Sequence, residues 1–257
     1  MRAKRKNTVF LAVSSLLLLL LAGCEREAVQ TVPERSWTLT WSDEFNGIAG
    51  AAPNAANWTF DIGTGVNGWG NSELQYYTNR PSNISLDGKG NLVITARQEV
   101  FSGAPFTSAR IKSQGKFTQA YGRFETRLKT PTGPGLWPAF WLLGANIDTK
   151  PWPQCGEIDI MEHVGYDPDT LVGTIHTQAY NHVKGTQKSK KIFIKNPYTD
   201  FHVYAIDWTA QKMDFLLDGV VYLSIPNEHK TTDEWPFDKK YYLLMNLAIG
   251  GNWGGAK

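Results

Sequence analysis

The chain contains very little cysteine. Among its 257 residues only positions 24 and 155 are cysteine. Because Cys24 ends a leader-like segment, Cys155 has no partner within the rest of the chain, and the sequence predicts a fold without an internal disulfide. No histidine and asparagine accompany Cys155 at a spacing typical of thiol enzymes. We therefore expect Cys155 to be a small packed side chain rather than a nucleophile.

Neither sign of charge predominates. The chain has 26 lysines and arginines against 24 acidic residues, for a formal charge of +2. Four of the basic residues are Arg2, Lys4, Arg5 and Lys6, so without residues 1–23 the balance is 22 to 24, a net charge of −2. No basic patch indicates a nucleic-acid partner, and a neutral polymer would need no electrostatic steering.

The first 24 residues have the pattern of an export signal. A basic start precedes the apolar residues 8–20, a run too short for a span of about 20 residues. Leu-Ala-Gly-Cys at 21–24 resembles a bacterial lipobox, which implies a lipoprotein signal peptide at 1–23 and a lipidated Cys24 with a polar tether over 24–36. That arrangement predicts a lipid-anchored protein of the bacterial cell envelope, at the outer membrane or cell surface. Ordinary secretion with an accidental cysteine is the alternative.

Long amphipathic helices are also missing. Twenty-four glycines and 13 prolines punctuate short segments in which apolar and polar residues alternate, a pattern typical of strands. The segments are 37–41, 92–96, 123–128, 191–194, 213–217, 220–225 and the continuously apolar 241–249. Asp218-Gly219 predicts a two-residue hairpin turn. The sequence therefore predicts an all-β, antiparallel sandwich in a single domain over 37–257.

Three carboxylates lie within six residues in Gly-Glu-Ile-Asp-Ile-Met-Glu at 156–162. In a strand Glu157 and Asp159 share one face. A straight strand would continue that face with Met161 and bury Glu162, which is costly for a carboxylate. A β-bulge near Ile160 and Met161 would return Glu162 to the other two. The segment therefore predicts a row of acids on one sheet face.

Two carboxyl groups that face one bond are the usual equipment for glycoside hydrolysis, in which one protonates the leaving oxygen and the other attacks the sugar or activates water. The ten tryptophans agree with this chemistry, since flat aromatic faces suit the apolar C–H faces of sugar rings. Spacing alone leaves two alternatives, a solvated acidic strand face and a calcium site.

The segment 152–165, WPQCGEIDIMEHVG, resembles the active-site strand of glycoside hydrolase family 16, and within it the bacterial laminarinases, which cleave β-1,3-glucans. Further matches follow in the family's order over nearly all of 37–257. They are WSDEF at 41–45, WGNSELQYY at 69–77, SARI at 108–111, GLWPAFWLL at 135–143, GTIH at 173–176 and NLAIGGNW at 246–253. Members with an extra bulge residue, here Met161, include laminarinases, agarases and carrageenases.

The resemblance implies a concanavalin-like β-jelly roll with a concave substrate cleft. It implies a retaining mechanism in which Glu157 is the nucleophile, Glu162 is the general acid and later the general base, and Asp159 orients Glu157. The positions that match substrate-binding residues of the family are Asn71, Arg110, Trp137, Trp141, Trp152, His176, Asn246 and Trp253. Glu73 could act in either role, and His176 could alternatively be a strand histidine without contact to sugar.

The resemblance implies no cofactor for the chemistry. It does suggest a structural calcium ion, with Glu44 and the carbonyl of Gly88 at the matching positions. Family members usually continue past the position of residue 257 with a closing strand, so we expect the catalytic domain at 37–257 to lack it. The expected partners are a β-glucan polysaccharide and, through Cys24, a membrane; the protein is expected to be a monomer.

The leading interpretation is a retaining endo-β-1,3-glucanase of the laminarin type. The same fold could instead act on mixed-linkage β-1,3-1,4-glucan or an agarose-type galactan. It could also transfer the glycosyl group to another sugar. A non-catalytic β-glucan-binding protein is the alternative from another class, although such relatives typically lose the two glutamates that are kept here.

Overall fold

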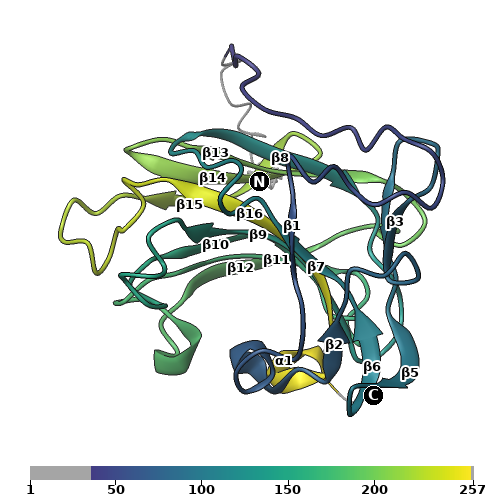
Figure 1. Cartoon of the computed structure of the whole chain (residues 1–257). Coiled ribbons are helices and arrows are strands. Elements are labelled where there is room, and N and C mark those ends of the chain that lie inside the picture. The colour runs from purple at the N-terminus through teal and green to yellow at the C-terminus, as the bar shows by residue number, and fades with distance from the viewer. Residues whose placement is uncertain (1–35, 256–257) are drawn as a thin grey trace, which may run out of the picture.

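The computed structural model describes residues 36–255, which form two layers of β-sheet (Figure 1). The helices of this part of the chain are short: η1 (Gly68–Ser72), η2 (His182–Lys184) and α1 (Gly251–Gly254). The strands are β1 (Thr59–Asp61), β2 (Gln75–Tyr77), β3 (Ile84–Leu86), β4 (Leu92–Ile94), β5 (Arg97–Phe101), β6 (Ala104–Ser108), β7 (Arg110–Lys112), β8 (Gly122–Leu128), β9 (Leu136–Gly144), β10 (Glu157–Glu162), β11 (Thr170–His176), β12 (Lys188–Phe193), β13 (His202–Trp208), β14 (Lys212–Leu217), β15 (Val220–Pro226) and β16 (Tyr241–Ile249).

Seven strands make the larger sheet, in the order β1-β7-β16-β9-β10-β11-β12. Four strands, β15-β14-β13-β8, make the second sheet, which lies above the first in Figure 1. All pairs within these two sheets are antiparallel, while β2 and β6 of a small third sheet pair in parallel. The predicted all-β antiparallel sandwich is confirmed, and β10 lies inside the larger sheet with neighbours on both sides.

The hydrophobic core lies between the two sheets. From the larger sheet, Ile158 and Leu142 contribute to it; from the smaller sheet, Trp208 and Phe215 do, and all four are fully buried. The Trp208 ring meets the Tyr241 ring edge-on at 5.3 Å between centroids. One face of each strand thereby packs in this core. A second, smaller apolar cluster includes Leu143, Tyr242 and Leu244, with Trp141 and Trp152 packed against it.

The predicted hairpin is confirmed. β14 and β15 pair through Leu217 and Val220, and the two residues between them, Asp218 and Gly219, both have positive φ, at 49° and 80°. Positive φ at both central positions is the type I′ geometry that matches the twist of the strands it joins. The strand predicted at 241–249 is likewise observed with the same bounds.

The strand predicted at 37–41 is wrong. Its apolar residues do not share a buried face, because Trp37 and Leu39 are exposed. Trp41 instead packs on the aromatic rings of Phe117 and Trp58, with centroids 5.0 and 5.5 Å away. The alternation of apolar residues here therefore reflects aromatic packing at one position and not a sheet face.

The signal peptide at 1–23, the lipidated Cys24 and nearly all of the tether over 24–36 lie outside the described residues. These assignments stay predictions from the sequence. Over residues 36–255, no helix is long and apolar enough to cross a membrane.

Candidate active site

A break in strand register lies in the middle of β10. Asp159 lies opposite Trp141 of β9, and the next residue of β9, Phe140, lies opposite Met161. One residue of β10 is therefore extra, and the pairing with β11 shifts over the same stretch. The predicted β-bulge is confirmed at its predicted position.

The bulge determines which side chains face the core. Ile160 and Met161 are consecutive, yet both are buried in the core with 1% exposure. Two successive core residues return Glu162 to the face that carries Glu157 and Asp159. The three carboxyl groups therefore share the face of the larger sheet that points away from the core.

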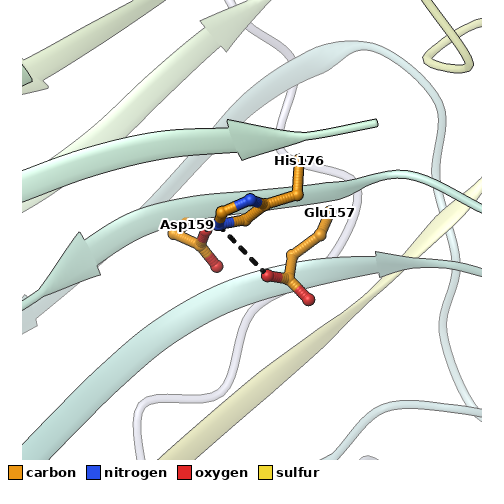
Figure 2. Close-up of side chains that lie close together, drawn as sticks. All are labelled: Glu157, Asp159 and His176. Carbon is orange, nitrogen blue, oxygen red and sulfur yellow. Dashed lines mark ion pairs between the residues drawn. The ribbon is translucent and has the colours of Figure 1, made fainter. Parts of the chain in front are cut away.

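A histidine of β11 lies directly beside Glu157 and Asp159 (Figure 2). His176 is paired with Glu157 across the two strands. Its Nε2 atom lies 3.3 Å from Asp159 Oδ2 and 3.7 Å from Glu157 Oε1. Asp159 and His176 are almost completely buried. The prediction that His176 belongs to the site is consistent with this contact, and its Nε2 faces the catalytic acids rather than a neighbouring backbone group.

Glu162 is held from the other side by a tryptophan of β9. The indole N–H of Trp137 donates a hydrogen bond of 3.0 Å to Glu162 Oε1. The Trp253 ring of α1 meets the Trp137 ring edge-on at 5.3 Å. These two predicted residues thus reach the site together and fix the orientation of Glu162.

Burial raises the pKa of all three carboxyl groups. For Glu157 the loss of solvent and then the neighbouring Asp159 charge raise the pKa to about 8, while His176 lowers it. For Glu162 the loss of solvent and the Asp159 charge raise the pKa to about 8. For Asp159 burial raises the pKa well above its ordinary value. The site therefore holds protons at neutral pH that exposed carboxyl groups would have lost.

A chain of hydrogen bonds continues from β9 across β16. The Trp141 indole N–H donates to Asn246 Oδ1 at 2.8 Å, and the Asn246 amide donates to the Tyr77 hydroxyl at 3.2 Å. The Tyr77 hydroxyl donates to Glu73 Oε2 at 3.1 Å, and Asn71 Nδ2 lies 3.4 Å from Glu73 Oε1. The predicted Asn71, Trp141 and Asn246 thus form one network, in which Tyr77 is a member that the sequence analysis did not identify.

Arg110 of β7 is fixed between two indole rings. Its guanidinium carbon lies 4.7 Å from the centroid of the Trp69 ring and 4.9 Å from that of Trp141. Asp61 Oδ2 lies 2.9 Å from Arg110 Nε, and its other oxygen lies 2.6 Å from Lys112 Nζ. Asp61 and Trp69 were not among the site residues expected from the sequence. Asp61 ends a strand of three residues, which is too short to show an alternation of apolar and polar side chains. Trp69 begins the motif WGNSELQYY at 69–77.

A second aromatic group lies where the loop before β10 meets the loop after β11. The predicted Trp152 lies 5.1 Å from the ring of His182, between centroids, at an interplanar angle of 34°. The His182 ring in turn meets the His176 ring edge-on at 5.1 Å. His182 was not expected from the sequence, in which its spacing of six residues after His176 is the only signal.

The two segments predicted to hold calcium lie near each other. The carbonyl oxygen of Glu44 lies beside Gly90, and Gly88 lies beside Ala49, so the two predicted segments are neighbours. The nearby Asp43 carboxylate accepts hydrogen bonds from the amide of Phe45 and from the side chains of two further residues, Asn57 and Trp58. Calcium usually takes six to eight oxygen ligands, and the neighbouring segments supply only a few, so the site stays a prediction.

Within residues 36–255, one group of acidic, histidine or cysteine side chains has the spacing to hold a metal ion, namely Glu157, Asp159 and His176, whose donor atoms lie within 4.8 Å of one another. The side chains of the same three residues also lie close enough together for proton transfer. The buried Cys155 packs against Leu143 and Tyr242, and burial raises the pKa of its thiol to about 12. The expectation that Cys155 is a packed residue agrees with both observations.

Comparison with known proteins gives one consistent family. The model of "Glycosyl hydrolases family 16" matches residues 70–257. A beta-glucanase of Rhodothermus marinus is 44% identical over 252 residues, which cover 94% of this chain and 86% of the relative. A glucan endo-1,3-beta-glucosidase of Cryptopygus antarcticus is 38% identical over 235 residues, covering 86% and 84% of the two chains.

The solved structure of the laminarinase from Rhodothermus marinus matches with a TM-score of 0.82 and 45% identity, covering 86% of this chain and 91% of that one. This similarity confirms the expected β-sandwich fold as well as the resemblance seen in the motifs. The chain belongs to glycoside hydrolase family 16.

Proposed function

We propose that the protein is a retaining endo-β-1,3-glucanase that hydrolyses laminarin-type glucan with Glu157 and Glu162. The observation that carries the proposal is the bulged strand β10, which turns both glutamates and Asp159 to one face. Relatives named beta-glucanase and glucan endo-1,3-beta-glucosidase, each covered over most of its length, support the choice of substrate.

In the first step Glu157 attacks the anomeric carbon of the sugar, and the glycosidic bond breaks. Glu162 gives its proton to the departing oxygen, so the leaving chain exits as an alcohol and the sugar stays attached to Glu157 as an ester. In the second step Glu162 takes a proton from water, which attacks the same carbon and displaces Glu157. Two inversions give net retention.

The raised pKa values support this division of roles. The Asp159 charge is the second cause, after burial, of the raised pKa of both Glu157 and Glu162, so a proton on Asp159 makes it easier for one of the two glutamates to ionise. The pKa of Asp159 is raised well above its ordinary value by burial, so Asp159 is the natural holder of this proton. Glu162, with a pKa near 8, remains protonated at neutral pH as a general acid must.

The residues beside β10 are suited to a neutral sugar chain. Trp141 and Trp137 offer flat apolar faces, and their indole N–H groups are already used by Asn246 and Glu162. Arg110 is stacked between indole rings, a placement that keeps its remaining N–H groups oriented for hydroxyl acceptors. These contacts favour polysaccharide over a small charged substrate.

Mixed-linkage glucan is the second candidate substrate. A non-specific endo-β-1,3(4)-glucanase from family GH16 matches this chain with a TM-score of 0.82 and 41% identity, covering 88% of this chain and 90% of that one. Activity on barley β-glucan measured beside laminarin separates a strict β-1,3 enzyme from one with broader specificity.

The lipobox-like Leu-Ala-Gly-Cys at 21–24 supports a further proposal, namely a monomer anchored through Cys24 to the bacterial envelope. Metabolic labelling with a tagged fatty acid, compared between the full chain and Cys24→Ser, tests the anchor.

The test of the proposed activity is release of reducing ends from laminarin by the purified protein. We expect release at neutral pH, with the β-anomer as the first product in NMR spectra, and a loss of about 10⁴-fold in Glu157→Ser. Circular dichroism of the variant must show the same β-sheet content. Full activity in a folded Glu157→Ser protein would contradict the assignment.

A further inference from the structure

We infer that His182 contacts the glucan chain beside Trp152, where the loop before β10 meets the loop after β11. This inference rests on the proposed function, because it concerns how the same glucan chain is held. It adds His182, which no sequence pattern assigned, as a residue that contacts substrate.

The order of strands places recognition residues on both sides of the catalytic strand. Arg110, Asn246 and Trp141 lie on β7, β16 and β9, on one side of β10. His176 lies on β11, on the other side, and His182 follows it in the loop to β12. An enzyme that cuts within a chain must hold sugar on both sides of the broken bond. The β11 side therefore requires its own contacts.

The rings of Trp152 and His182 pack against each other and form one aromatic surface patch. Their centroids are 5.1 Å apart and their planes differ by 34°, so each ring covers part of one face of the other. His182 is exposed and Trp152 is half-buried, so both rings are accessible to a ligand. His176 joins this surface to the catalytic acids, because its ring contacts His182 and its Nε2 lies 3.7 Å from Glu157.

The loop that carries His182 is fixed by its own hydrogen bonds. The buried Asn181 accepts a hydrogen bond from the amide of Lys184 and donates one to the carbonyl of Thr177. The amide of Thr186 donates to the Asn181 carbonyl, and its hydroxyl donates to the carbonyl of Ala179. A side chain held on so well-bonded a turn loses little entropy when a sugar binds, which favours affinity.

The chemistry of His182 suits sugar hydroxyls. In the described part of the chain its ring nitrogens have no hydrogen-bond partner, although its ring is packed against two others. Partial loss of solvent around the imidazole and the adjacent His176 lower the pKa of His182, so the imidazole is neutral at pH 7. A neutral imidazole offers one donor and one acceptor, while Trp152 offers a flat face to the C–H side of a ring.

The test compares His182→Ala with wild type on laminari-oligosaccharides of defined length. We expect a KM about tenfold higher, kcat within about threefold, and a shift of the cleaved bond away from positions that place a sugar on the β11 side. His182→Tyr keeps a ring and should retain most of the affinity. Val183→Ala, the adjacent exposed residue, is the matched control and should behave as wild type.

Binding provides a second measurement that does not depend on turnover. Calorimetry with laminari-oligosaccharide should show about tenfold weaker binding by Glu157→Gln/His182→Ala than by Glu157→Gln, with equal melting temperatures. Unchanged KM, cleavage pattern and affinity in an active enzyme would overturn the contact of His182 with glucan while leaving the proposed function in place. A wild-type protein that does not act on laminarin or bind its oligosaccharides would instead reject the function on which this contact rests.

Discussion

Two groups of acidic residues in this molecule show opposite behaviour. In the first, Glu157, Asp159 and Glu162 lie buried on β10, and burial raises their pKa values, to about 8 for the two glutamates. In the second, Glu228 lies near the surface and accepts hydrogen bonds from Lys188, Lys230 and Tyr180. These hydrogen bonds, that from Lys188 above all, lower the pKa of Glu228 to about 2.

The contrast shows that neighbours and solvent, and not residue type, decide what a glutamate does. Glu228 is fully ionised and satisfied, so it can only hold its loop in place. The carboxyl groups of β10 have too few donors for their burial, and among the described residues Asp159 Oδ2 has only the contact with His176 Nε2 at 3.3 Å and no hydrogen bond. Under-satisfied, buried carboxyl groups that retain protons at neutral pH are what acid–base catalysis requires.

Of the changes to these two groups of acids, loss of the Glu162 proton should reduce activity the most. A general acid contributes about 10²–10⁴-fold, so Glu162→Gln should lose that much activity on laminarin. In wild type the activity should decline as pH rises through about 8, because Glu162 then ionises and has no proton to donate. Initial rates measured from pH 4 to 10 show this decline in activity. Wild-type activity that stayed constant up to pH 10 would contradict the assignment of Glu162 as the general acid.

Neutralising Asp159 should reduce activity and increase stability. Burial raises the pKa of Asp159, so its contribution to stability is fully present while it is protonated, below its ordinary pKa, and is lost as pH rises through the raised pKa. Asp159→Asn cannot ionise, so its melting temperature should exceed that of wild type by about 2–8 °C at pH 8. Calorimetry at pH 4 and pH 8 provides the control, since the increase in melting temperature should vanish at pH 4. An equal increase in melting temperature at pH 4 and pH 8 would mean that the effect comes from packing and not from ionisation of Asp159.

Parts of this site were predictable from the sequence because they are local. The period of two in β10 and the cost of burying Glu162 together require a bulge, and the bulge is observed near Met161. The hairpin at Asp218-Gly219 is local in the same way. Each of these predictions depends only on residues adjacent in the chain.

Other parts depend on contacts between distant segments. Asp61 holds Arg110 from a strand nearly fifty residues earlier, and no pattern around Asp61 indicates that pairing. The position of His182 against Trp152 depends on the path of the loop after β11. The failure at residues 37–41 has the same origin, because what decided the conformation was the packing of Trp41 on distant rings.

The smallest expected effect comes from Glu228→Gln, which tests the other half of the contrast. Since the pKa of Glu228 is lowered, its contribution is present above its ordinary pKa and lost as pH falls towards 2. At pH 7 the variant should lose at most about 4 °C in melting temperature, because exposed ion pairs are weak and screened. The difference should shrink in 1 M salt, and laminarin hydrolysis should stay within about twofold of wild type. A loss of activity comparable with that of Glu162→Gln, in a folded protein, would mean that the surface group also takes part in catalysis and that solvent exposure does not separate the two roles.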